Sequence, residues 1–151
     1  MLPQSAEAEM AVLGSIFLAP VEVMRLCHEQ KITPSHFYTP AHCILFDVFR
    51  ELHSAGKPID LILTVQFLND RGLMDKAGGP AHVAHLYGYV PTAANAGYYI
   101  DILKEKFVLR ETIRICGELT AQAYEPPQDV IAFLEGAKLR LSRITDQIKA
   151  A

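Results

Sequence analysis

Two amphipathic segments separated by a pair of prolines constrain the fold of this chain more than any other feature. After the prolines, apolar residues recur at alternating spacings of four and three, the a/d pattern of a helix that packs along one partner. These residues are Val130, Leu134, Ala137, Leu141, Ile144 and Ile148. Before the prolines, the same rhythm is carried by Ile102, Leu109, Ile113, Cys116 and Ala123, with Lys106 and Thr120 at two of its positions. A helix does not continue through Pro126 and Pro127. We therefore predict an antiparallel helical hairpin over residues 95–148, with these apolar residues as its seam.

One seam does not use all the apolar residues of the two expected helices. Those that lie off it are Phe107, Val108, Ile115, Leu119, Ile131, Phe133 and Leu139. Together they exceed what a single antiparallel contact can bury, so some must pack on the preceding residues, while others favour self-association or a docking helix.

The residues before the hairpin form a series of shorter expected helices. Capping residues, helix-starting prolines and a glycine-rich loop mark where these helices begin. The start signals are Ser5, Pro20, Thr39-Pro40, Asp60 and Gly78-Gly79-Pro80. Gly14 lies inside the first helix, at a cost of about 1 kcal/mol relative to alanine, which a close helix crossing could offset. No run of alternating apolar and polar residues indicates a strand.

The expected fold is therefore all-α, with a globular head of about six helices at residues 1–94 and the hairpin at 95–151. We expect the boundary near Val90 to Asn95 and regard the two parts as one domain, because 151 residues are the usual size of a single domain.

Composition and charge exclude several classes of function. The uncharged apolar stretch from Met10 to Val21 is too short to span a bilayer and follows no signal peptide. Three unclustered cysteines indicate a reducing cytosol, so we expect a cytoplasmic protein. Residues 1–94 carry 6 basic and 9 acidic side chains. A domain that grips phosphates is distinctly basic, so strong direct nucleic-acid binding is disfavoured.

No catalytic or metal-binding pattern accompanies this composition. His82 and His85 are spaced i, i+3, but neither HExxH nor a Cys/His set joins them, so capping or surface roles are the better interpretation. Cys43 beside His42 is a weak dyad, because adjacent helical residues point to different sides. Asp70 and Asp75 flank a glycine turn and are better interpreted as solvated caps.

A nucleotide-binding loop is also missing from the sequence. A P-loop needs GxxxxGK[ST], whose backbone amides and lysine surround the phosphates. The only Gly-Lys pair, Gly56-Lys57, is followed by Pro58, and Glu51 stands where the first glycine should be. We therefore expect no catalysis and no cofactor in this chain.

Several short motifs, in order, resemble the N-terminal region of the DnaB-type replicative DNA helicases. They are Pro3-Gln4-Ser5-Ala6-Glu7-Ala8-Glu9, Ala11-Val12-Leu13-Gly14-Ser15, Phe37-Tyr38 with His42, Gly56-Lys57-Pro58-Ile59-Asp60, Gly78-Gly79, Val90-Pro91-Thr92-Ala93-Ala94-Asn95 with Tyr98-Tyr99, and Lys104-Glu105-Lys106 with Leu109-Arg110. Each motif is weak alone, but their order and spacing over nearly the whole chain are specific.

The resemblance implies a collar domain of head and hairpin, six copies of which form a ring, often as a trimer of dimers. In that family a linker helix then leads to a RecA-like motor that carries the P-loop, uses ATP and Mg²⁺ and moves on single-stranded DNA. Because the sequence ends at Ala151, we expect linker and motor to be absent, as in an isolated domain or a truncated natural relative. The start at Met1-Leu2-Pro3 lacks a short leader found in many members, which suggests trimming or a phage-like variant.

The implied role is ring assembly and docking of primase, with a helicase loader as a further partner. The primase-facing positions implied by the resemblance are His82, Ile113 and Leu119, and His82 stands where an aromatic residue is expected. The alternative is a stand-alone phage or regulatory protein that mimics the collar and binds host primase or helicase. A small helical enzyme is a third interpretation, with no motif behind it.

Overall fold

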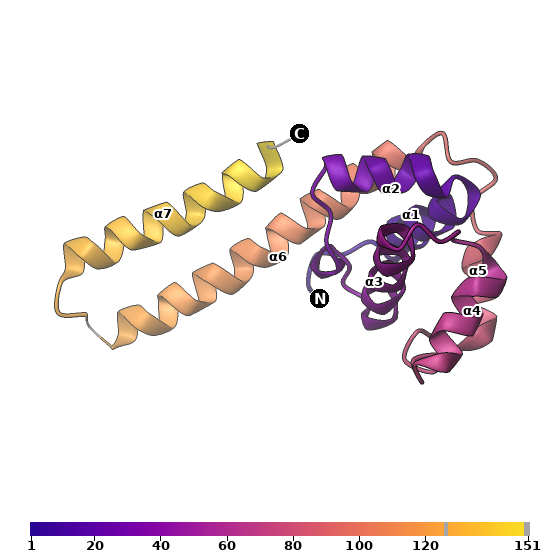
Figure 1. Cartoon of the computed structure of the whole chain (residues 1–151). Coiled ribbons are helices and arrows are strands. Elements are labelled where there is room, and N and C mark those ends of the chain that lie inside the picture. Colours follow the sequence, from indigo (N-terminus) through magenta and orange to yellow (C-terminus); the bar gives the residue numbers. More distant parts are fainter. Residues whose placement is uncertain (126, 150–151) are drawn as a thin grey trace.

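Helices account for all the regular structure in the part of the chain that the computed structural model describes, residues 1–125 and 127–149. They are α1 (Ala6–Leu18), α2 (Pro20–Glu29), the 3₁₀ turn η1 (Pro34–His36), α3 (Pro40–Ser54), α4 (Leu61–Asp70), α5 (Gly79–Tyr87), α6 (Ala96–Tyr124) and α7 (Val130–Lys149). The expected all-α class is confirmed. The head comprises α1 to α5 and η1, while α6 and α7 form the long hairpin that projects from it (Figure 1).

The helix starts follow the local sequence signals. Ser5 Oγ accepts a hydrogen bond from the backbone N–H of Ala8 at 3.1 Å, and Asp60 Oδ1 accepts one from Leu63 at 2.7 Å. Each bond satisfies a backbone donor that a first helical turn leaves free. Prolines occupy the first turns of α2, α3 and α5, where a missing N–H costs nothing.

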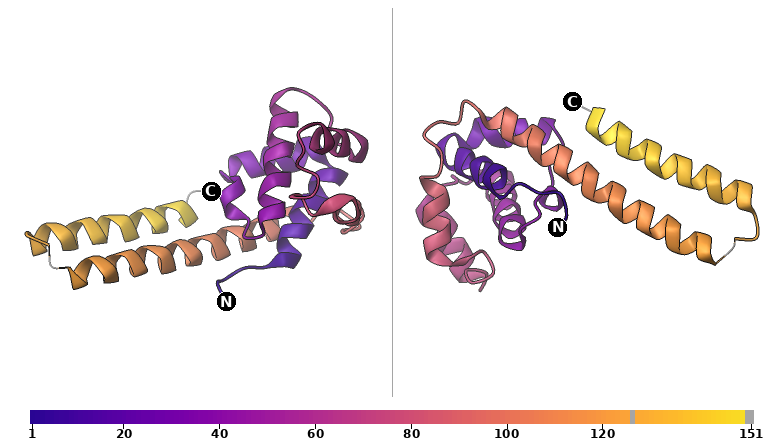
Figure 2. Two further views of the ribbon diagram at one scale, coloured as in Figure 1. Left: turned by 90° about the horizontal axis from the view of Figure 1, so that it is seen from below. Right: turned by 180° about the vertical axis from the view of Figure 1, so that it is seen from behind.

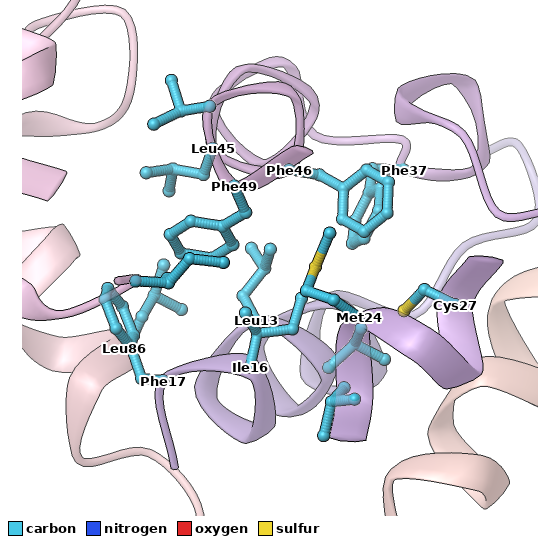
Figure 3. Close-up of a cluster of buried hydrophobic side chains, with 14 of the residues drawn as sticks. Leu13, Ile16, Phe17, Met24, Cys27, Phe37, Leu45, Phe46, Phe49 and Leu86 are labelled. Carbon is cyan, nitrogen blue, oxygen red and sulfur yellow. The ribbon is translucent and has the colours of Figure 1, made fainter. Parts of the chain in front are cut away.

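Helix α1 runs through the centre of the head and contacts α2, α3, α5 and α6. Its burial is not limited to one stripe: Val12, Leu13 and Ile16 are all completely buried, and Ala6 in the first turn is exposed. A helix surrounded by others is buried on nearly every side rather than along one stripe. Figure 3 shows the resulting core, in which Leu13 and Ile16 lie among aromatic side chains of α3 such as Phe49.

Gly14 marks the close helix crossing that would offset its cost. A Cβ atom at this position would lie 2.9 Å from the backbone oxygen of Leu86 on α5, so only glycine lets the two helices approach this closely.

The first turns of α6 belong to the core of the head. Ala96, Ile100 and Leu103 are buried there among residues of the other helices. The helix then leaves the head and turns back through α7, which lies antiparallel to it (Figure 2). A division at residue 94 stays a prediction, because α6 runs without a break from the core of the head into the hairpin.

The contact between α6 and α7 does not use the predicted seam of α6. Val108 and Ile115 are buried against Ile144 of α7, with Phe107 and Leu119 packed beside them. The seam prediction was therefore wrong by one residue for Leu109 and Cys116, which are exposed. The packing of its first turns in the head determines which side of α6 faces α7. This packing cannot be predicted from the local spacing of apolar residues.

On α7 the predicted seam is divided. Ile144 is buried against α6 and Ala137 is partly covered, but the other seam residues are exposed. These are Val130, Leu134, Leu141 and Ile148. Ile102, at the other end of the predicted seam, packs against the core of the head instead.

Candidate functional site: the outer face of the hairpin and a buried polar network

The exposed seam residues form one apolar face of the hairpin. Successive residues of an α-helix are about 100° apart. Leu109 follows Val108 by one residue, and Leu141 precedes Ile144 by three, so each is displaced from its buried neighbour in the same rotational sense. Because α6 and α7 are antiparallel, the same sense of rotation brings both stripes to the same side of the hairpin. We call this surface the hairpin face; it comprises Leu109, Ile113, Cys116, Val130, Leu134, Leu141 and Ile148.

The exposed fractions along this face are large for aliphatic side chains. Ile113 is 50% exposed and Leu134 is 58% exposed. Single exposed leucines are common on protein surfaces, but a continuous stripe of them over two helices is typical of an interaction surface.

Ion pairs hold the hairpin in register beside its apolar contact. Glu118 of α6 pairs with Arg140 of α7 across the hairpin and with Arg114 one turn away on its own helix. At the base, the Arg110 guanidinium donates to the backbone oxygens of Pro3 at 2.9 Å and His36 at 3.0 Å. The hairpin face is therefore presented by helices that are anchored to the head.

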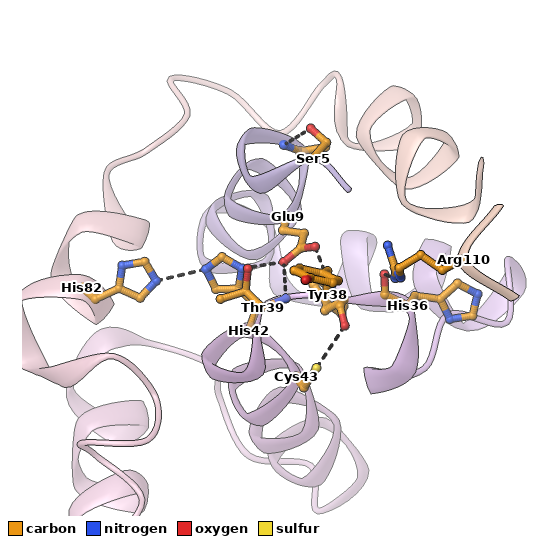
Figure 4. A network of polar contacts seen from close by, with 11 residues as sticks. Ser5, Glu9, His36, Tyr38, Thr39, His42, Cys43, His82 and Arg110 are labelled. Atoms are coloured by element: carbon orange, nitrogen blue, oxygen red, sulfur yellow. Dashed lines mark hydrogen bonds and ion pairs between the residues drawn. The ribbon is translucent and has the colours of Figure 1, made fainter. Parts of the chain in front are cut away.

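A second polar feature lies inside the head, where Glu9 is 1% exposed (Figure 4). Its carboxylate accepts hydrogen bonds from the backbone N–H groups of Tyr38 at 2.8 Å and Thr39 at 3.2 Å, and from His42 Nδ1 at 2.7 Å. Burial alone would raise the pKa of Glu9, but these hydrogen bonds outweigh burial and hold the pKa below its usual value. The charged carboxylate thus ties α1 to the start of α3.

The network continues from α3 to α5. His42 Nε2 lies 3.0 Å from His82 Nε2, so the two rings form a hydrogen bond in which one nitrogen donates its N–H and the other accepts. Burial, His42 and His85 lower the pKa of His82. Gly78 faces this ring: its φ is +98°, and a Cβ there would lie 2.7 Å from His82 Cδ2. This geometry suits a structural role, in which the bond between His42 and His82 holds α3 against α5.

The network does not position a nucleophile beside its histidines. Cys43, next to His42 in sequence, donates through Sγ to the backbone oxygen of Phe37 at 3.1 Å, and burial followed by the charge of Glu9 raises its pKa. His42 is engaged by Glu9 and His82 instead. Over residues 1–125 and 127–149, no three His, Cys, Asp or Glu side chains are grouped so that they could hold a metal ion. In the same residues no helix is both long enough and apolar enough to cross a membrane.

The sequence analysis named Glu9 only as part of a family motif and did not predict its burial. The signal was weak: a carboxylate directly before the apolar run from Met10 to Leu13. Nothing local shows that it is held by backbone N–H groups from a segment about thirty residues away.

The three positions assigned to primase docking are not gathered in one chain. His82 is on α5 in the head, partly exposed, with His42 as its partner. Ile113 lies on the hairpin face, and Leu119 is half-buried beside the contact between α6 and α7.

Comparison with known proteins shows which family this chain matches. Residues 1–105 match the family model described as the DnaB-like helicase N terminal domain. The chain is 32% identical over 96% of its length to the replicative DNA helicase DnaB of Geobacillus stearothermophilus, and 35% identical over 96% to that of Haemophilus influenzae. It covers 32% and 31% of these proteins, so it spans about a third of the length of the curated relatives.

Solved structures show the same arrangement of helices. The crystal structure of the N-terminal domain of DnaB helicase from Mycobacterium tuberculosis is similar with a TM-score of 0.83 and 31% identity, covering 95% of this chain and 99% of that one. A structure of a DnaB-like replicative helicase and its interactions with primase is similar with a TM-score of 0.69 over 88% of this chain and 30% of that one. At 23% identity, the second likeness shows the fold alone.

Proposed function

The chain belongs to the family of DnaB-like helicase N-terminal domains, and from this we propose that it is the assembly module of a replicative helicase in DNA replication. In this role the hairpin face pairs with the same face of a second copy. Three dimers then build a hexameric ring, a trimer of dimers.

The observation that carries the proposal is the single apolar face formed by two exposed stripes. A two-helix hairpin has only one internal contact, and here that contact is already made by Val108, Ile115 and Ile144. The hairpin face therefore remains exposed to water. Covering apolar surface of this extent with a partner is favourable and stabilises the resulting complex. A second copy offers the same face, so a two-fold axis is the simplest way to cover it.

We further propose that the assembled module docks primase, with His82, Ile113 and Leu119 as candidate contacts. One of the similar structures is that of a DnaB-like replicative helicase and its interactions with primase, so primase is a partner of that helicase. Because His82 is on the head and Ile113 on the hairpin, a surface that uses both is more easily formed by two adjacent copies than by one. A helicase loader is a further candidate partner.

We assign the ATP-dependent chemistry of the helicase to residues outside this chain. The relatives are about three times as long as this chain and are named helicases. In this proposal a motor domain outside this chain binds their ATP and Mg²⁺. The present chain would be non-catalytic and cytoplasmic. A stand-alone protein that mimics the collar and binds host primase or helicase is the alternative, and a gene that continues into a GxxxxGK[ST] motif would decide against it.

Sedimentation velocity tests the assembly proposal. We expect the wild-type chain to sediment as a dimer or larger species at tens of micromolar. The variant Leu109→Ser/Leu134→Ser should sediment as a monomer with an unchanged far-ultraviolet circular dichroism spectrum, because both side chains are exposed in the single chain.

The matched control is Val21→Ser/Ile62→Ser, which removes two exposed aliphatic side chains from the head. It should associate like the wild type. A wild-type chain that stays monomeric at tens of micromolar would refute the proposal.

A further inference from the structure

A pocket of about 580 Å³ lies between α2 and α3 on the head. Its floor consists of buried apolar side chains, namely Met24, Cys27, Ile32 and Phe46. Burial raises the pKa of the Cys27 thiol to about 12, so the floor is uncharged. The volume is in the range of pockets that bind a small molecule or a few side chains.

The rim of the pocket is polar and exposed. It consists of His28, Lys31 and Thr33 from α2 and the segment after it, and of Arg50, His53 and Ser54 from α3. Within each group the two basic side chains are three residues apart in sequence. Each wall of the pocket therefore carries a pair of groups that can donate hydrogen bonds to an anion.

The charge of this rim has one sign. Among the residues that the structure describes, no carboxylate lines the pocket, although the chain has 17 acidic and 14 basic residues. Within the described part of the chain, Lys31 and Arg50 form no ion pair. Glu51, the neighbour of Arg50 in sequence, is outside the pocket and pairs with Arg71 at 3.0 Å. The two cations of the rim are therefore available to a ligand.

Lys31 has a backbone conformation that usually belongs to glycine. It follows α2 with a φ of +58°, and among the described residues it is the one non-glycine residue with a positive φ. Similar turns follow α3 and α4, where a backbone N–H also bonds to the oxygen five residues earlier, and they have Gly56 and Gly72 at this position. Glycine avoids the steric cost of a Cβ atom in this conformation. Because the turn itself favours glycine, the lysine points to a role of its side chain on the rim.

The pocket lies on the side of the molecule away from the hairpin face. Thr33 on its rim donates its backbone N–H to His36 Nδ1 at 3.0 Å, and the His36 ring lies 4.2 Å from the ring of Phe107 on α6, measured between centroids. Phe107 precedes Leu109 of the hairpin face by two residues, so the two side chains are about 200° apart around α6. A second copy that covers the hairpin face leaves the pocket open.

We propose that this pocket binds an acidic peptide segment of another protein, in which one large apolar side chain is flanked by aspartate or glutamate. The apolar side chain lies on the floor, and the carboxylates beside it face Lys31 and Arg50. Charge complementarity is the reason for this choice, because lysine and arginine donate charge-assisted hydrogen bonds to carboxylates. Two cations on separate walls favour a segment with several carboxylates over a free acid with one. The site is complete in one chain and does not depend on the proposed assembly.

Selection from a library of random peptides displayed on phage tests the proposal, with the wild-type chain as bait. The library is first depleted on the variant Lys31→Gly/Arg50→Ala, which removes peptides that bind elsewhere, including those on the hairpin face. We expect the peptides selected afterwards to carry an aromatic residue or leucine beside aspartate or glutamate.

Isothermal titration calorimetry with the most enriched peptide measures the contribution of the rim. Lys31→Gly/Arg50→Ala should weaken binding at least about tenfold. The matched control Arg25→Ala/Lys57→Ala also removes two exposed basic side chains, but outside this pocket, and should bind like the wild type. In ¹⁵N-resolved spectra of the wild-type chain, the peptide should shift the amide signals of Cys27 and Ile32.

The single variant Lys31→Gly separates binding from folding. Its melting temperature should rise, because glycine fits the turn after α2, while its affinity for the peptide should fall. A raised melting temperature with unchanged affinity would overturn the role assigned to Lys31.

Three results would overturn the proposal as a whole. They are a selection without peptides that depend on Lys31 and Arg50, a selection of basic or uncharged peptides, and equal weakening by the control variant. If 4-phenylbutyrate shifted the signals of the floor residues while no such peptide was selected, the pocket would be a site for a free organic acid instead. Sedimentation of the wild-type chain tests assembly separately, so either proposal can fail without the other.

Discussion

Glu9 shows how a single residue can hold the head together. Its carboxylate is buried in α1, yet it is bonded to two backbone N–H groups before α3 and to His42 within α3. A buried charge is tolerated only when such partners replace water. His82 extends the contact to α5. One side chain therefore organises three segments that are distant in sequence.

We predict that Glu9→Gln lowers the free energy of unfolding by about 3 kcal/mol, because an amide NH₂ would face one of three donors that now point at the carboxylate. Urea denaturation followed by circular dichroism measures the change. The control Glu7→Gln, an exposed position in the same helical turn, should change the free energy by less than about 0.5 kcal/mol. Equal effects of the two substitutions would contradict the assigned role of Glu9.

His36 predicts a pH dependence of stability. Burial, with smaller contributions from the charges of Lys104 and Arg110, lowers the pKa of His36 from 6.5 to about 4 in the folded chain. Between these values the unfolded chain binds the extra proton, so stability is fully present above pH 6.5 and falls as the pH decreases toward 4.

Replacing His36 by asparagine keeps an acceptor for the Thr33 N–H but removes the titrating ring. We expect the free energy of unfolding of His36→Asn to fall less than that of the wild type between about pH 7 and about pH 4. Urea titrations at both pH values measure this difference. An equally steep loss in the two proteins would assign the pH dependence to other groups.

At the scale of elements, α6 decides the architecture. Its first turns are buried in the head through Ile100 and Leu103, and its remainder forms half of the hairpin. The continuous helix transmits the orientation of the head to the hairpin, so the residues of α6 that face α7 are chosen by packing in the head. Two apolar stripes then take separate roles, one inside the hairpin and one on the hairpin face.

This division predicts opposite outcomes for two aspartate substitutions on α7. Ile144→Asp places an unpaired charge in the contact with Val108 and Ile115, at a cost of several kcal/mol. We expect α7 to lose its protection from amide hydrogen exchange. Leu134→Asp, at an exposed position, should leave the protection of α7 near that of the wild type while weakening self-association. Protection lost equally in both variants would contradict the assignment of inner and outer faces.

The whole molecule is a globular head with a long projecting hairpin, and the hairpin has little core of its own. Of the residues that the structure describes, Val108, Ile115 and Ile144 are the ones buried at the contact between its helices. A partner that covers the hairpin face would therefore contribute directly to the stability of the folded chain.

A dependence of melting temperature on protein concentration follows. If folded chains associate and unfolded chains do not, the melting temperature rises with concentration by mass action. We expect a rise between micromolar and hundred-micromolar wild-type chain in differential scanning calorimetry. The Leu109→Ser/Leu134→Ser variant should melt at one temperature over the same range, and a wild-type melting temperature independent of concentration would contradict assembly through this face.

Local sequence and tertiary structure each determined a distinct part of this protein. The all-α class, the helix starts at Ser5, Pro20 and Asp60, and the existence of the hairpin follow from capping, proline geometry and apolar periodicity, which act between residues close in sequence. The order of short motifs also led to the family that the comparisons show. The burial of Glu9, its bond with His42 and the choice between the two stripes of α6 needed the tertiary structure. Those features depend on contacts between segments tens of residues apart, and on a helix rotation that the packed head alone decides.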